Sequence, residues 1–122
     1  MFTTLFSAAL LSVAAQATAP DNAAPSAKLS QESKAVLRCS AAFALISYGQ
    51  ANGNEEALQW PDISTRGREF FVRSMAQMMD ETGLDRAGIA DLVGKEAQRL
   101  AENDDVQKVM PACLVMLDSS GV

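Results

Sequence analysis

Two cysteines are the side chains of this sequence best suited to covalent chemistry, and they lie far apart along the chain. Cys39 shares an apolar helical face with Val36, Phe43 and Ile46, and Cys113 lies on a similar stripe near the C-terminus. We therefore expect both thiols to be buried, and their separation is unlike the Cys-x-x-Cys spacing of thiol redox enzymes. In an exported chain such a pair indicates one structural disulfide rather than catalytic thiols. Closing a loop of about 75 residues would stabilise the fold by about 4–5 kcal/mol from chain entropy.

The only basic cluster of the sequence contains Arg66 and Arg68, with Arg73 a further turn and a half along. At the start of a helix, where unpaired N–H groups and the helix dipole favour anions, these arginines could contact a phosphate or a carboxylate. The simpler interpretation, which we favour, is a solvated first turn with Asp62 and Glu69 as ion partners. Arginine at a helix start opposes the dipole, and this local inconsistency keeps the anion site open.

The sequence contains no histidine, so it lacks the commonest general base, the commonest metal ligand and the usual switch near neutral pH. Catalytic triads of the usual kind and haem attachment through Cys-x-x-Cys-His are excluded. The acidic run at 102–105 lacks the ligand spacing of a calcium loop and is explained as a corner between two helices with an N-cap aspartate. Met75 and Met78 have the Met-x-x-Met spacing once, which falls short of an array for copper, and no histidine assists them. We expect neither a metal nor a cofactor.

Flexible methionine side chains suit surfaces that accept varied apolar partners. Most of the methionines lie on stripes that the core requires, so packing is their default role. Val115 and Met116 fall off the apolar stripe of the last helix. If they are exposed, they mark an apolar contact surface.

The composition predicts one folded domain and excludes some partners. The chain has 122 residues, of which 48% are hydrophobic and 20% charged, and a single core serves a chain of this length. Its net charge of −5 opposes binding to phosphate backbones and to anionic lipid surfaces. Nucleic acid is therefore not an expected partner.

The N-terminus resembles an export signal. Residues 5–15 form an apolar run of the right length, and Ala15-Gln16-Ala17 supplies the small-x-small pattern for cleavage after Ala17. The segment before the run has no Lys or Arg, but the alternative of an uncleaved anchor is too short to span the bilayer. We predict a signal peptide at 1–17, a disordered leader at 18–29, no stable membrane insertion after cleavage, and a periplasmic or secreted protein.

The remaining sequence predicts an all-α fold, a small four-helix bundle with one disulfide, over residues 30–120. The first expected helix begins at residue 30 and ends between residues 48 and 51. The others cover residues 64–81, 85–103 and from 104 or 105 to about 120, with a linker or short helical turn at 55–60. The first helix is apolar almost all round, so the others must surround it. Trp60 is expected to cover one end of the bundle. Pro111 is expected to kink the last helix or to break it.

The segments 37–44, 67–71 and 110–114, together with the export signal, resemble small exported helical proteins of alphaproteobacteria, a group that has no assigned activity. A looser likeness, in size, compartment and cross-link, is to acid-stress periplasmic chaperones. The resemblance implies an exported helical fold and brings no substrate, cofactor or site residue with it.

These observations favour a non-enzymatic binding or interaction protein of the cell envelope, of envelope-stress type, that acts through an apolar helical surface on a protein partner there. The alternative is a small enzyme or anion-binding protein that uses Arg66, Arg68 and Arg73. A deep pocket converging on the arginines would favour the alternative, and a shallow apolar groove near Met116 would favour the binding protein.

Overall fold

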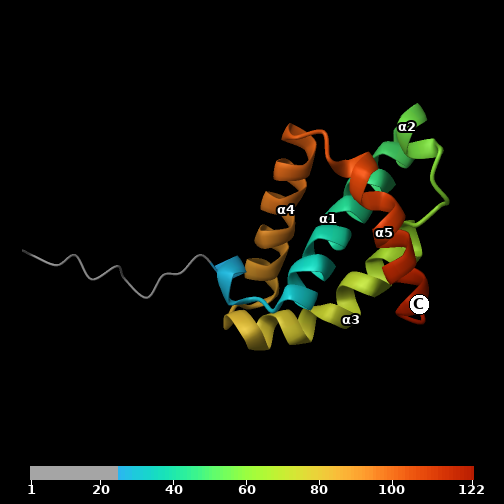
Figure 1. Ribbon diagram of the computed structural model, residues 1–122. Helices are drawn as coiled ribbons and strands as arrows, with labels where there is room; N and C mark the ends of the chain where they lie inside the picture. The colour runs from blue at the N-terminus through green and yellow to red at the C-terminus, as the bar shows by residue number, and fades with distance from the viewer. Residues whose placement is uncertain (1–24) are drawn as a thin grey trace, which may run out of the picture.

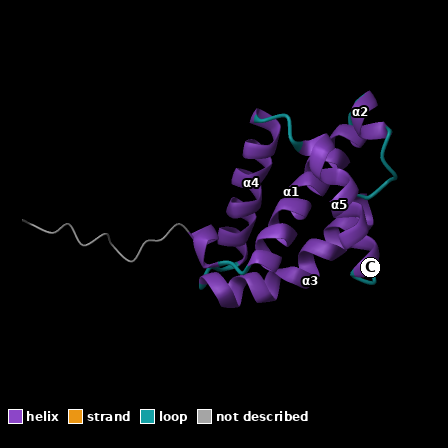
Figure 2. Ribbon diagram, viewed as in Figure 1, coloured by secondary structure: helices purple, strands orange, loops and turns teal. Residues whose placement is uncertain are grey.

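The computed structural model describes residues 25–122, and this part of the chain is entirely helical apart from its turns and loops (Figures 1 and 2). The predicted signal peptide and residues 18–24 of the predicted leader lie outside the described residues. A short 3₁₀ helix at Pro25–Lys28 precedes five α-helices: α1 at Gln31–Ala51, α2 at Glu55–Leu58, α3 at Ser64–Thr82, α4 at Arg86–Glu102 and α5 at Val106–Ser119. None of the helices within 25–122 combines the length and the hydropathy needed to cross a membrane.

Helix α1 is the central element of the fold. It packs against α2, α3, α4 and α5, and Figure 1 shows it running between α4 and α5 with α3 crossing below. All five consecutive residues at 39–43 are buried, which requires neighbours on every side of the helix. This confirms the prediction made from its apolar sequence.

The packed domain begins earlier than the sequence predicted. Leu29, assigned above to a disordered leader, is only 4% exposed and packs with Leu37 and Met78. Burying this side chain removes apolar surface from water and holds the 3₁₀ turn before it against the fold. The structure therefore places Leu29 in the packed part of the chain and not in the leader.

Local sequence signals explain most of the helix ends. The Ser30 hydroxyl accepts a hydrogen bond from the Ser33 N–H at 3.1 Å, and Gly83 ends α3 with φ of 73°. Asp105 precedes α5 as expected, but its side chain makes no capping hydrogen bond and instead pairs with Lys108 at 3.6 Å. Helix α5 continues through Pro111, so the predicted alternative of a break there is wrong.

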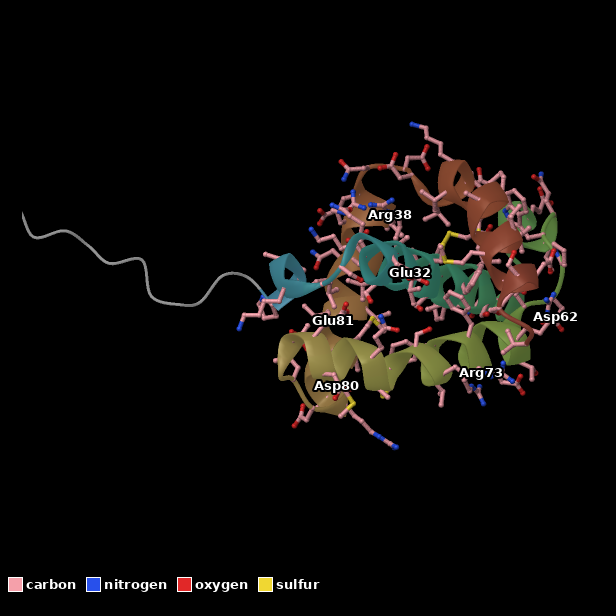
Figure 3. All side chains as sticks on the ribbon, turned by 60° about the horizontal axis from the view of Figure 1, so that its bottom comes forward. Glu32, Arg38, Asp62, Arg73, Asp80 and Glu81 are labelled. Atoms are coloured by element: carbon pink, nitrogen blue, oxygen red, sulfur yellow. A yellow bond between two sulfur atoms is a disulfide. The ribbon has the colours of Figure 1, made fainter. Side chains whose placement is uncertain are left out.

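The disulfide between Cys39 and Cys113 is present and joins α1 to α5 (Figure 3). The two Cα atoms are 5.1 Å apart, within the usual range for a disulfide. Both cysteines belong to the larger core cluster, which also contains Phe43, Phe70 and Leu117. The prediction that the first and last long helices are neighbours is confirmed.

Candidate functional site

A pocket of about 340 Å³ lies where α1, α3 and α4 meet. Helix α1 lines it with residues 40, 43, 44 and 47, and α3 lines it with residues 64, 67, 68 and 71. Each set follows the i, i+3, i+4, i+7 spacing of one helix face, so two long faces are turned toward the same space. Ala90 and Val93 of α4 complete the lining. The pocket is therefore built on rigid helices and not on loops.

Small residues and one aromatic pair give the pocket its shape. A Cβ added at Gly67 would lie 3.0 Å from the Phe43 Cβ, so the glycine allows α3 to approach α1 closely. The Phe43 ring in turn packs edge-to-face on Phe70, with ring centroids 5.5 Å apart. Ala44 and Ala90 leave the space beside this contact open.

Ser40 is the unusual polar residue of the pocket. It is only 4% exposed, and its hydroxyl oxygen has no hydrogen-bond partner among the described residues. A helical serine commonly donates to the carbonyl four residues earlier, as Ser74 does to Phe70 at 3.0 Å and Ser119 does to Val115 at 2.9 Å. Buried hydroxyls are nearly always paired, so Ser40 stands out as a lining residue of an apolar pocket whose buried hydroxyl has an unused donor and acceptor.

The structure separates the three arginines proposed as an anion site. Arg66 donates to the Val122 carbonyl at 3.0 Å and to Asp118 at 2.9 Å, and Arg73 donates to the Ser120 carbonyl at 3.4 Å. Figure 3 labels Arg73 on the side of α3 near the C-terminal residues. Arg68 alone lines the pocket. The three guanidinium groups do not converge on one space.

The expected ion partners of these arginines have other roles. Asp62 accepts hydrogen bonds from the Ser64 N–H at 3.1 Å and from the Ser64 hydroxyl at 3.0 Å. Both bonds lower the pKa of Asp62, and the bond from the Ser64 N–H has the larger effect. Asp62 therefore supplies the capping interaction at the start of α3. Within residues 25–122, neither Asp62 nor Glu69 forms an ion pair with an arginine.

Val115 and Met116 do not form a joint surface. Val115 is 67% exposed, whereas Met116 is partly buried against the core around the disulfide. A different apolar surface lies on the outer side of α3. There Val72 is 58% exposed and lines a hollow of about 360 Å³ with Met75, Ala76 and Met79.

A second hollow, of about 470 Å³, shares Ser47 and Ser64 with the first pocket. Trp60 lines it, packs on the core and donates its indole N–H to Gln107 at 2.7 Å. The Gln50 amide nitrogen lies 2.9–3.1 Å from the carbonyls of Ala57, Trp60 and Pro61. These bonds hold the α2–α3 loop in place beside the pocket.

The titratable chemistry of the pocket is sparse. Arg68 is the only titratable residue in its lining, and no group of three or more His, Cys, Asp or Glu residues within 25–122 could hold a metal ion. Ser40 was not among the site residues predicted from the sequence, although the sequence contains a signal for it. It is a single hydroxyl inside the apolar run of α1, where helix burial on all sides predicts that it will lack water.

No protein-family model matches this chain, and comparisons with curated proteins and with solved structures give no significant match.

Proposed function

We propose that this protein binds a small apolar molecule without catalysing a reaction, and that its binding site is the pocket between α1, α3 and α4. The observation that carries the proposal is a preformed apolar pocket whose walls come from three packed helices. In this proposal the four long helices form a single bundle around α1. Spaces between the helices of bundles are common sites for small ligands, and about 340 Å³ lies within the usual range of pocket sizes.

The same geometry favours binding over catalysis. General acid–base chemistry needs groups that gain and lose a proton near the working pH and that lie within reach of the substrate. The pocket offers one arginine and three serine hydroxyls, with no carboxylate or thiol in its lining. Arg66 and Arg73, which the alternative requires, are directed to residues 118–122 instead.

The proposal places the protein in the periplasm or outside the cell. The disulfide between Cys39 and Cys113 supports this, because such bonds persist in oxidising compartments. The predicted signal peptide points the same way.

The test uses N-phenyl-1-naphthylamine, an uncharged dye whose fluorescence increases in apolar surroundings. We expect the purified protein to bind the dye saturably with one-to-one stoichiometry. Ala44→Phe would place an aromatic ring in the pocket from an exposed position of α1, and we expect it to weaken dye binding about tenfold or more, equivalent to 1.4 kcal/mol.

The matched control is Ala76→Phe, the same substitution in the hollow on the outer side of α3. We expect this variant to bind the dye as the wild type does. Absence of saturable binding to the wild type would refute the proposed function. Loss of binding in Ala76→Phe alone would place the binding surface on the outer side of α3.

A further inference from the structure

We propose that the ligand of this pocket is a small amphipathic carboxylic acid that carries a second polar oxygen, such as a hydroxyl. Its apolar body would lie between α1, α3 and α4, its carboxylate would pair with Arg68, and its second oxygen would hydrogen-bond to Ser40. This inference rests on the proposed function, because it names the class of ligand that the same site takes.

The unpaired hydroxyl of Ser40 indicates a polar oxygen in the ligand. Ser40 is a lining residue of the pocket, and its hydroxyl oxygen is buried and lacks a partner within the described chain. A rotation of the side chain about χ1 would bring this hydroxyl to a ligand in the pocket. An unpaired buried hydroxyl destabilises a fold unless something else satisfies it. A purely hydrocarbon ligand would leave the group unpaired, whereas a ligand oxygen would supply the missing hydrogen bond.

The guanidinium group of Arg68 indicates a negative charge on the ligand. It is exposed at the pocket and makes no ion pair or side-chain hydrogen bond within residues 25–122, whereas Arg66 on the same helix pairs with Asp118 at 2.9 Å. A cation beside an apolar cavity favours ligands that combine an apolar body with a negative charge. Since the chain carries a net charge of −5, this attraction is local to Arg68 and does not come from the field of the whole protein.

The charges around the pocket determine the orientation of the ligand. Asp62 lines the second hollow, beyond Ser47 and Ser64, and its negative charge would repel a carboxylate placed there. The carboxylate therefore belongs beside Arg68. Ser40 lies seven residues from Ser47 along α1, which is about 10 Å on a helix, so the second oxygen belongs at the opposite end of the pocket from that hollow.

The experiment measures how well three compounds of equal chain length displace N-phenyl-1-naphthylamine from the pocket. The compounds are 8-hydroxyoctanoate, octanoate and 1,8-octanediol, which carry both polar groups, only the carboxylate, and only hydroxyls. For the wild type we expect 8-hydroxyoctanoate to displace the dye best. Octanoate should be about tenfold weaker, because the buried hydroxyl stays unpaired, and the diol about fivefold weaker, because a solvent-exposed ion pair contributes modestly.

Two variants assign these differences to residues. In Ser40→Ala we expect the advantage of 8-hydroxyoctanoate over octanoate to disappear, while its advantage over the diol remains. In Arg68→Gln we expect the advantage of 8-hydroxyoctanoate over the diol to disappear, while its advantage over octanoate remains. In the wild type, the advantage of 8-hydroxyoctanoate over the diol should decrease at high salt. Arg86→Gln is the matched control, since Arg86 is exposed, lacks an ion pair within 25–122 and lies outside this pocket.

The outcomes separate this inference from the proposed function. If the dye binds but all three compounds displace it equally, or if both variants weaken every compound by the same factor, the inference is wrong and the apolar binding site stands. If the dye does not bind the wild type, the proposed function itself fails. An effect of Arg86→Gln equal to that of Arg68→Gln would also overturn the assignment of the carboxylate.

Discussion

At the scale of single residues, Ser40 connects stability with binding. Its buried hydroxyl makes no hydrogen bond within the described chain, although the neighbouring core residues Cys39, Ala41 and Phe43 pack without such a defect. A binding protein gains from such a group only when a ligand satisfies it. The ligand-free protein should therefore be less stable than a variant that lacks the Ser40 hydroxyl.

We predict that Ser40→Ala raises the free energy of unfolding of the ligand-free protein by about 1 kcal/mol more than Ser74→Ala does. Both substitutions gain the same helix propensity of alanine over serine, but Ser74→Ala also loses a hydrogen bond to the Phe70 carbonyl. Urea unfolding of the two variants measures the difference. Equal effects would mean that the Ser40 hydroxyl finds water or another partner.

Glu81 makes the stability depend on pH. It lies near the end of α3, and its carboxylate accepts a hydrogen bond from the Ser30 N–H at the start of α1 (Figure 3). Interaction with the Ser33 hydroxyl, and then with Ser30, lowers the pKa of Glu81 below its ordinary value of 4.5. A lowered pKa means that the carboxylate contributes stability above about pH 4.5, and that this contribution is lost as the pH falls through the folded-state pKa.

We predict that Glu81→Gln is less stable than the wild type at pH 7 and that the difference shrinks as the pH falls from 4.5 to 3. Urea unfolding across this range measures it. Glu69→Gln is the control, because Glu69 is an exposed carboxylate of the same helix with no hydrogen bond or ion pair within residues 25–122. A Glu81→Gln effect that is constant with pH would contradict a role for the charge.

At the scale of elements, two helical glycines have opposite reasons to be present. Gly67 lies where α3 meets α1, and a Cβ there would approach the Phe43 Cβ to 3.0 Å. Phe43 is itself only 1% exposed and packs on Phe70, so it has little freedom to move away. Gly94 in α4 has nothing within 4 Å of the position of an added Cβ. The first glycine serves packing, and the second weakens its helix without such a benefit.

We predict that Gly94→Ala stabilises the protein by about 0.5–1 kcal/mol through helix propensity. Gly67→Ala gains the same propensity but overpacks the α1–α3 contact, which costs about 1–3 kcal/mol, so it should be destabilising overall by about 1 kcal/mol. Thermal unfolding of both variants measures whether each substitution stabilises or destabilises the protein. Stabilisation by Gly67→Ala would mean that α3 can move away from α1 without loss.

Local signals in the sequence were sufficient to predict the long helices and much of the core. Ser30, Gly83 and Asp85 mark helix ends through capping that acts within a few residues, and the apolar run of α1 predicts that other helices surround it. Leu29 was missed because its burial depends on Met78, a residue far along the chain.

The pocket could not be predicted in the same way. It depends on which faces of α1, α3 and α4 meet, and helical periodicity does not determine that pairing. The arginines were grouped because they are close in sequence, but Arg66 and Arg73 turn toward residues 118–122 and Arg68 toward the pocket. Met75 and Met79 were assigned to the core, yet they are only partly buried, because α3 reaches beyond the helices that cover its inner side.

At the scale of the whole molecule, the disulfide connects the last helix to the centre of the fold. Cys39 and Cys113 are 74 residues apart in sequence, so the bond restricts most of the domain in the unfolded state. Met110 and Leu117 of α5 lie in the same core cluster as Phe43 and Phe70. The cross-link and the apolar packing therefore act on the same contact between α1 and α5.

We predict that replacing both cysteines by alanine lowers the free energy of unfolding by about 4 kcal/mol, because the unfolded chain regains the entropy that the closed loop removes. Unfolding should remain a single transition, since α5 shares its core with α1 and α3. Urea unfolding followed by Trp60 fluorescence and by circular dichroism tests both statements. The control is wild-type protein unfolded in the presence of excess reductant, without alkylation of the buried thiols, which should show a similar loss without a change of sequence.

For a domain whose whole stability is about 5–15 kcal/mol, a loss of this size makes folding depend on the compartment. We therefore expect the wild-type protein produced under reducing conditions to be markedly more sensitive to protease than the oxidised protein, with Gly94→Ala restoring part of the resistance. Equal protease resistance of the reduced and oxidised forms would show that apolar packing alone maintains the fold.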